Sequence, residues 1–339
     1  MNNYNSWVLT RDLYKKWLSK FILDNLNNKV FIYKNFNILY ITYLAKQDNE
    51  TRNQWLKKIH FRLNGAKYEY KKFNNIIYFI FKFLTSFLHE IVKLLLIKYS
   101  FKNSNYRKEK NTIYFHSLSS NLRINDGVCY DRHFSNSPNL DSKYNLKTVH
   151  LITLIPSFNE LFKFSTYIKE INNKLKLLEK KYIILNHYIS FKNLFLIYFS
   201  IFKKWFLFRK ETGKLLKNKA FVINKIDFDD ILLRELEKSF FGEIQLGLLY
   251  GKSFGNFFTK ISKKNIVITY GETLSSIRPV YHFSNKIKNK VKFISIQHAV
   301  NHKNKMSSHH KKNDFIKSNK YNYSLIPDYY LLHGSQSKN

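Results

Sequence analysis

Residues 266–298 read IVITYGETLSSIRPVYHFSNKIKNKVKFISIQH, and this stretch contains two short apolar runs, Ile266–Tyr270 and Val291–Ile296. Each run is bounded by polar residues and has the length of a strand, so the pattern predicts two buried strands. A polar break at residues 102–111 precedes four other runs of this kind. They are Thr112–His116, Thr148–Ile155, Tyr182–Leu185 and Tyr329–Leu332.

Helical patterns lie between these runs, at Asn159–Lys180 and Phe228–Lys238. Strands that are apolar along their whole length and alternate with helices are typical of a parallel sheet covered on both faces. The sequence therefore predicts an α/β fold, with a Rossmann-like parallel sheet in residues 106–339. In residues 1–105 the pattern predicts a smaller α/β or helical lead-in. Two short strands are expected there: Val30–Tyr33 and Ile38–Leu44.

The most apolar part of the chain is the segment 76–99, IIYFIFKFLTSFLHEIVKLLLIKY. Its length would permit a membrane span, but Lys82, Ser86, His89 and Lys93 recur at helical spacing and form one narrow polar stripe. A helix of this kind lies either in a protein core, with the stripe as its wet edge, or in a membrane interface. The pattern alone does not choose between the two.

A second segment, Leu194–Phe208, leaves the same two alternatives open, because it is too short to span a bilayer and is interrupted by Lys203 and Lys204. Two aromatic segments edged by lysine favour membrane contact more than either does alone. The single cysteine, Cys129, excludes an intramolecular disulfide and favours a reducing compartment. The first residues contain no apolar core of signal-peptide length, so a cytoplasmic location is expected.

The chain carries 58 Lys+Arg against 23 Asp+Glu, a formal net charge of +35. Part of this excess accompanies an abundance of Lys, Asn, Ile, Phe and Tyr, all of which have AT-rich codons. The remainder favours phosphate-bearing partners such as anionic lipid, a nucleotide-sugar, a polyprenyl-phosphate carrier or nucleic acid. Basic residues are spread over the whole chain and no nucleic-acid-binding motif is present, so no specific nucleic acid is expected.

Polar and titratable residues follow three of the predicted strands. They are Glu272, Arg278, Gln297, His298, His333 and Gly334. Because the carboxyl ends of parallel strands meet at one edge of a sheet, these residues are expected to converge there. A carboxylate, an imidazole and a guanidinium could then supply a general base, its orienting partner and a phosphate clamp. The structural alternatives are a helix cap for Glu272 and an ordinary hydrogen-bonding role for His298.

A metal site is not expected, although four histidines lie close in sequence: His298, His302, His309 and His310. No HExxH glutamate separates the first two, and no cysteine pair is near. The sequence GKSFG at residues 251–255 matches neither of the glycine-rich phosphate-binding patterns.

Five segments together resemble a family of bacterial surface-carbohydrate biosynthesis proteins, thought to be glycosyltransferases of the two-Rossmann (GT-B) type. The segments are IYFHSLSS, YDRHFSNSP, IVITYGETLSSIRPV, KFISIQHAV and SLIPDYYLLHGS. The family shows a DRxFG-like motif after a strand, an acidic residue and a later arginine after another, a QH motif, and a PD-strand-G segment. The motif positions are Asp131, Arg132, Glu272, Arg278, Gln297, His298, Pro327, Asp328 and Gly334.

The resemblance implies transfer of a sugar from a nucleotide-sugar to a lipid-linked or oligosaccharide acceptor in lipopolysaccharide or capsule biosynthesis. It implies Glu272 or His298 as general base. It implies a substrate-binding role for Asp131, Arg132, Arg278, Gln297, His333 and Gly334. The nucleotide-sugar is a substrate, and no further cofactor is implied. The protein is expected to work as a peripheral protein at the inner face of the plasma membrane.

Three departures from the family pattern concern the acceptor pocket. Ser135 and Ala299 stand where glycines are expected, and no tryptophan accompanies Glu272. Because the chain reaches Asn339 directly after the last motif, the donor-binding half is expected to be missing, and a separate carboxy-terminal half to supply it. The chain alone could then be inactive. The alternative function is that of a non-catalytic basic protein that binds a membrane or nucleic acid.

Overall fold

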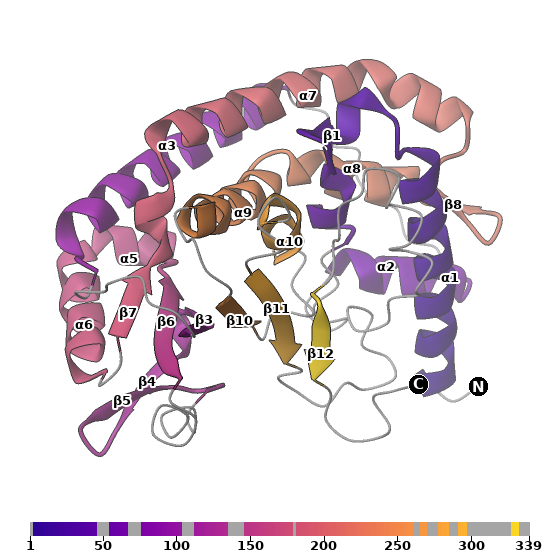
Figure 1. Cartoon of the computed structure of the whole chain (residues 1–339). Coiled ribbons are helices and arrows are strands. Elements are labelled where there is room, and N and C mark those ends of the chain that lie inside the picture. Colours follow the sequence, from indigo (N-terminus) through magenta and orange to yellow (C-terminus); the bar gives the residue numbers. More distant parts are fainter. Residues whose placement is uncertain are drawn as a thin grey trace.

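The computed structural model gives the protein a parallel sheet, helices on both faces of that sheet, and a large helical layer beside it (Figure 1). The structure describes residues 3–45, 54–66, 76–103, 112–134, 146–178, 181–259, 265–269, 277–284, 291–296 and 327–331.

The sheet has six strands, and every neighbouring pair is parallel. The strands are β3 (Thr112–Leu118), β6 (Lys147–Thr153), β7 (Lys181–Ile184), β10 (Asn265–Thr269), β11 (Val291–Ile296) and β12 (Tyr329–Leu331). Their spatial order is β7-β6-β3-β10-β11-β12. Counted along the chain this is 3-2-1-4-5-6, the order of the doubly wound Rossmann sheet. The prediction of a parallel α/β sheet is confirmed, and all six strands lie within two residues of their predicted bounds.

Helices α9 (Glu243–Thr259) and α10 (Arg278–Ser284) cover one face of the sheet. Alternate strand residues such as Tyr114, Val149 and Val267 contact them, because successive side chains of a strand point to opposite faces. Helices α5 (Phe158–Phe162) and α6 (Phe164–Leu177) lie where the helix Asn159–Lys180 was predicted, and α6 covers the other face over β6 and β7. Ser157 caps α5 in a capping box with Glu160.

The helical layer contains the largest hydrophobic core. It comprises α1 (Asn3–Asp24), α2 (Gln54–Leu63), α3 (Ile76–Ser100), α7 (Phe191–Lys217), α8 (Asp229–Ser239) and the first turns of α9. The core joins residues 14–94 with residues 189–249, so buried side chains from both sides of the polar break pack together. A division into domains at residue 105 stays a prediction.

The short elements of the lead-in are 3-10 turns and a hairpin. They are η1 (Lys29–Phe31), β1 (Ile32–Tyr33), β2 (Phe36–Asn37) and η2 (Ile38–Ile41). The strand predicted at Ile38–Leu44 is wrong. The Asn37 side chain accepts the backbone N–H of Leu39 at 2.9 Å and so begins a 3-10 turn.

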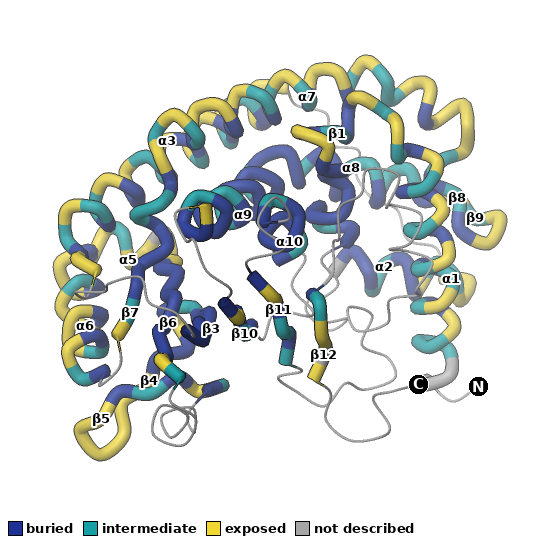
Figure 2. The backbone as a smooth tube through the Cα atoms, viewed as in Figure 1, coloured by how far each residue is buried: buried dark blue, intermediate teal, exposed yellow. Residues whose placement is uncertain are grey.

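Helix α3 confirms the predicted helix, but its polar stripe is not its outer edge. Lys93 is buried beside Glu90, and the Ser86 hydroxyl lies 3.2 Å from that of Tyr198 on α7. Exposed residues lie on the outer side of α3 and α7 instead (Figure 2). None of the helices within the described ranges combines the length and the apolarity that a membrane crossing requires.

Candidate functional site

The reversal of strand order puts β3 beside β10 in the middle of the sheet. From β3 the chain continues to β6 on one side, whereas from β10 it continues to β11 on the other. Ligands of doubly wound sheets bind beyond the carboxyl ends of the strands at this point, where the connections diverge. The candidate site is therefore the carboxyl edge of β3 and β10, flanked by β6 and β11.

Four polar side chains lie near the ends of these strands: His116, Thr153, Thr269 and Ser295. All four are buried. Thr269 pairs in register with Ser295, and His116 follows directly on the last aligned pair of β3 and β10. His116 Nε2 lies 3.1 Å from Thr153 Oγ1, and the imidazole packs edge-on against Phe254 of α9.

Burial lowers the pKa of His116 to about 3, so the imidazole is neutral near pH 7. Thr269 Oγ1 lies 3.5 Å from the Tyr281 hydroxyl of α10. Within the described ranges the buried Ser295 hydroxyl has no hydrogen-bond partner. This row supplies hydroxyls and a neutral imidazole. These four side chains can accept and donate hydrogen bonds, but the buried His116 does not exchange protons with solvent as a general acid or base would.

Asp131 ends β5 (Val128–Asp131), which with β4 (Leu122–Asn125) forms the hairpin that follows β3. Its carboxylate is 1% exposed, accepts the Ser117 hydroxyl and accepts the backbone N–H of His133 at 2.7 Å. Burial raises the pKa of Asp131, although these hydrogen bonds and Arg132 oppose the rise. The carboxylate thus anchors the hairpin to the end of β3. A substrate-binding role for Asp131 stays a prediction.

The two described arginines of the predicted site lie in different surroundings. Arg132 is exposed beside Asp131, and its backbone N–H donates to the Asn121 carbonyl. Arg278 begins α10, donates from Nη1 to the Tyr40 carbonyl at 3.0 Å, and places its guanidinium 5.7 Å from the Tyr40 ring. Its contact with a residue 238 positions away ties α10 to the helical layer.

The remaining predicted site residues lie outside the described residues: Glu272, Gln297, His298, His333 and Gly334. Asp328 is described, and its carboxylate accepts the Phe293 backbone N–H at 2.9 Å, which aligns β12 with β11. Among the residues that the structure describes, no group of three histidine, cysteine or acidic side chains could hold a metal ion.

Sequence reasoning missed His116, Thr269 and Ser295. A signal was present, because the runs TIYFHSL, NIVIT and VKFISI each carry a polar residue in one of their last three positions. A polar residue near the end of an otherwise apolar strand marks the edge at which ligands bind.

The fold and the site define the class of protein: an α/β protein built on a doubly wound parallel sheet with polar groups at its carboxyl edge. Comparison of the chain with protein-family models, with curated proteins and with solved structures gives no match.

Proposed function

We propose that this protein is a glycosyltransferase-like component of bacterial surface-polysaccharide biosynthesis, working at the inner face of the plasma membrane. Its doubly wound sheet is the acceptor-side domain of a GT-B-type transferase. The reaction transfers a sugar from a nucleotide-sugar to a lipid-linked or oligosaccharide acceptor, as the sequence resemblance implies.

The observation that carries the proposal is the adjacency of β10, β11 and β12, which are parallel neighbours. Chain segments that leave parallel neighbours begin at one edge of the sheet. Glu272 is the third residue after β10, and His298 and His333 are the second residues after β11 and β12. Motifs that are far apart in sequence therefore start from the same side of the molecule.

In this proposal Glu272 or His298 removes the proton from the acceptor hydroxyl as the glycosidic bond forms and the nucleoside diphosphate leaves. Arg132, exposed at the hairpin beside β3, pairs with phosphate oxygens. Asp131 positions that hairpin through Ser117 and the His133 backbone. Arg278 acts through α10, whose start it fixes against Tyr40.

The test is a transfer assay with the full chain, both alone and together with a separate nucleotide-sugar-binding half of a GT-B transferase. A lipid extract of bacterial membranes is the acceptor, and radiolabelled UDP-glucose, UDP-galactose, UDP-N-acetylglucosamine and GDP-mannose are the donors. We expect label from one donor to enter the lipid-linked or oligosaccharide fraction. Loss of a general base in Glu272→Ala or His298→Ala should lower the rate about 100-fold or more. Glu170→Ala, which removes an exposed carboxylate on α6, is the matched control and should retain the rate.

Wild-type rates in both Glu272→Ala and His298→Ala would remove the site assignment. Absence of transfer from every donor, with the added nucleotide-sugar-binding half as well as without it, would overturn the proposal. The alternative is a non-catalytic basic protein that binds a membrane or nucleic acid. If nucleic acid is the partner, we expect sequence-independent binding of RNA or DNA that falls steeply with salt.

A further inference from the structure

Helix α3 carries a continuous exposed apolar stripe along its whole length. The residues of the stripe are Ile77, Phe81, Leu84, Leu88, Val92, Leu95 and Tyr99. Each is 45–91% exposed. They recur every three or four positions, so they share one side of the helix. Soluble monomers rarely expose a contiguous apolar patch of this extent without a partner for it.

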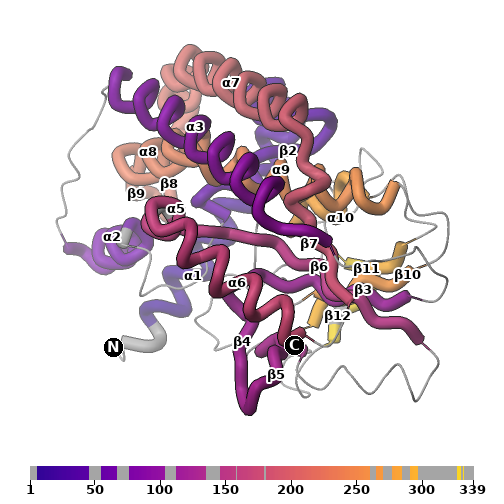
Figure 3. Tube along the Cα trace, turned by 90° about the vertical axis from the view of Figure 1, so that its left-hand side faces the viewer, coloured from indigo at the N-terminus to yellow at the C-terminus, as the bar shows by residue number. Residues whose placement is uncertain are grey.

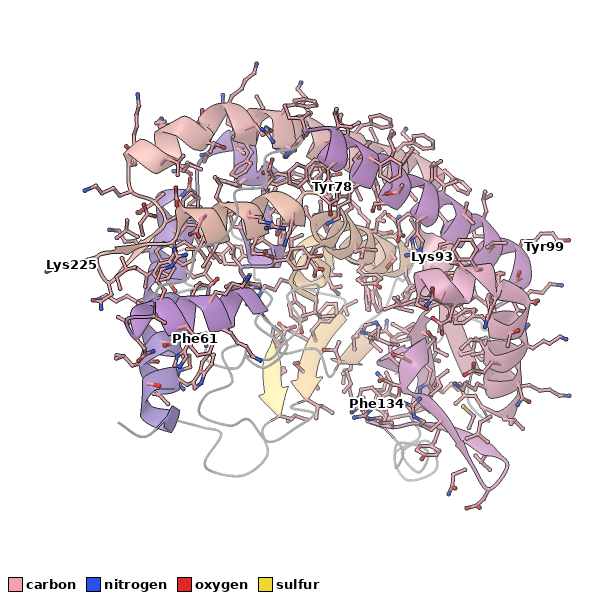
Figure 4. All side chains as sticks on the ribbon, turned by 180° about the vertical axis from the view of Figure 1, so that it is seen from behind. Phe61, Tyr78, Lys93, Tyr99, Phe134 and Lys225 are labelled. Atoms are coloured by element: carbon pink, nitrogen blue, oxygen red, sulfur yellow. The ribbon has the colours of Figure 1, made fainter. Side chains whose placement is uncertain are left out.

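Thr85 is exposed beside this stripe and its hydroxyl donates to the Phe81 carbonyl, but other polar residues of α3 lie on its inner side. Lys93 and Glu90 form an ion pair that is buried under the helix, and Ser86 contacts Tyr198 of α7. Figure 4 shows Lys93 pointing in toward the body of the molecule and Tyr99 projecting away from it. Burial lowers the pKa of Lys82, as it does for a cation partly removed from water. The helix is therefore mostly apolar where it meets solvent and polar on part of its inner side.

Helix α7 continues the apolar surface. Between residues 195 and 207 its exposed apolar residues are Phe195, Leu196, Phe199, Phe206 and Leu207. The two helices run side by side (Figures 1 and 3). Phe83 of α3 stacks on Phe202 of α7 at 4.2 Å between ring centroids, and Phe87 meets Phe195 edge-on at 5.1 Å. We call the seven residues of the α3 stripe and these five residues of α7 together the α3–α7 surface.

Lysines are interspersed with the α7 part of this surface and continue beyond it. The exposed ones are Lys192, Lys203, Lys210, Lys214 and Lys217. Apolar and aromatic side chains bordered by lysine are typical of helices that lie in the plane of a membrane interface. Such a helix sinks its apolar side into the boundary between headgroups and acyl chains, while its lysines meet anionic headgroups.

We propose that the α3–α7 surface docks the protein on an anionic lipid bilayer. A second copy of the chain is a poorer occupant, because two molecules of charge +35 repel each other. Nucleic acid would satisfy the lysines and could stack on the exposed rings, but it would leave the aliphatic side chains of Ile77, Leu88 and Val92 in water. A bilayer is the partner that matches both the aliphatic stripe and the charge.

Docking on a bilayer deepens the proposed function. The docking itself does not depend on that function, but the inference about the acceptor below rests on it. In Figures 1 and 4 the arrowheads of β11 and β12 point away from α3 and α7. A docked molecule would turn the carboxyl ends of these two strands away from the bilayer. That orientation suits an acceptor sugar at the far end of a lipid-linked chain more than one held at the headgroups.

The experiment is flotation of the full chain with phosphatidylcholine vesicles that contain about 30% phosphatidylglycerol. This anionic lipid gives the vesicles a negative surface potential that attracts lysines. The wild type should float with these vesicles and bind weakly to phosphatidylcholine alone. Phe81→Glu/Leu88→Glu, which puts two carboxylates into the α3 stripe, should lower the binding constant at least about tenfold. No nucleotide-sugar or acceptor is present, so failure here is distinct from failure of glycosyl transfer.

The matched control is Leu9→Glu/Phe162→Glu, which replaces the same residue types at exposed positions of α1 and α5. It should float like the wild type. Equal flotation of both double variants, or none by the wild type, overturns the proposal. A wild-type dimer in light scattering that Phe81→Glu/Leu88→Glu converts to a monomer, without vesicle binding, would assign the surface to a second copy and also overturn it.

A fluorescence measurement keeps the proposal testable if the glutamate variant fails to fold. The sole cysteine, Cys129, is 3% exposed, so Leu88→Cys offers one accessible thiol for an environment-sensitive dye. The emission of that dye should shift to the blue when anionic vesicles are added. The same dye at Phe162→Cys should not shift. A Leu88→Cys emission that stays unchanged while the protein floats would place the contact elsewhere and overturn the assignment.

Discussion

Helices α6 and α3 are both amphipathic, and they use their apolar residues differently. In α6, Phe164, Tyr167 and Ile171 are buried against the sheet, whereas Lys169 and Glu170 are exposed. This is the arrangement of a helix between a core and water. In α3 apolar residues occupy the outer side as well as the inner one, and the ion pair of Glu90 with Lys93 is inside. The difference indicates that the solvent side of α3 is adapted to an apolar phase.

The largest expected effect concerns the buried ion pair of α3. Lys93→Met leaves Glu90 buried without its cation, and removal of one partner of such a pair costs about 3–5 kcal/mol. Burial acts to raise the pKa of Glu90, but Lys93 and His89 outweigh it and hold the pKa below its ordinary value. Urea unfolding should show the loss at pH 7.

The double variant Glu90→Gln/Lys93→Met is the control for that loss. It removes both charges and should be clearly more stable than Lys93→Met alone. Equal stability of the two variants would mean that the pair does not organise the inner side of α3.

A second prediction tests the contrast between the helices directly. Ile171→Ala on α6 deletes a side chain that is 3% exposed and should cost about 2–4 kcal/mol through lost burial and a cavity. Leu88→Ala on α3 deletes one that is 58% exposed and should change the free energy of unfolding by no more than about 0.5 kcal/mol. Chemical denaturation of both variants gives the comparison. A large cost for Leu88→Ala would show that the α3 stripe stabilises the protein in water.

The third prediction concerns the sheet. Because the pKa of His116 is about 3 in the folded protein, well below its ordinary value of about 6.5, the unfolded chain takes up the proton first. The stability that this difference contributes is fully present above about pH 6.5 and is lost as the pH falls toward 3. At pH 5 the free energy of unfolding should have fallen by about 2 kcal/mol.

Comparison of unfolding at pH 7 and pH 5 checks this prediction. His116→Gln keeps a hydrogen-bonding group near Thr153 and should remove the share of the pH dependence that His116 contributes. Identical pH dependence in the variant and the wild type would contradict the burial of a neutral imidazole at the candidate site.

The smallest expected effect concerns Lys203, an exposed lysine of α7, and its contribution to vesicle binding. Lys203→Gln removes one exposed cation between Phe199 and Phe206 on α7. It should weaken binding to anionic vesicles by about 1 kcal/mol, or roughly fivefold, because each lysine at an anionic surface contributes about that much. Vesicle titration measures it. Glu170→Gln on α6 serves as control, and an equal change there would show that only overall charge matters.

The sheet could be predicted well because its strands are local apolar runs that differ from the polar segments around them. The 3-10 turn at Ile38–Ile41 could not, since the same run of apolar residues is compatible with a strand until Asn37 caps it. Glu272 and His298 remain predictions of the sequence, because they lie outside the described residues. His116 became a member of the site only when the pairing of β3 with β10 was known, because it directly follows the last aligned pair.

By itself the sequence determined the α/β class, the positions of the six strands and the existence of the long helix at residues 76–100, because apolar periodicity reports local structure. Only the tertiary structure decided the strand order and which side of α3 faces inward. Those depend on contacts such as that of Ser86 with Tyr198, 112 residues away. These contacts turn inward the side of α3 that carries Ser86, Glu90 and Lys93, which the local pattern allowed to be the wet edge.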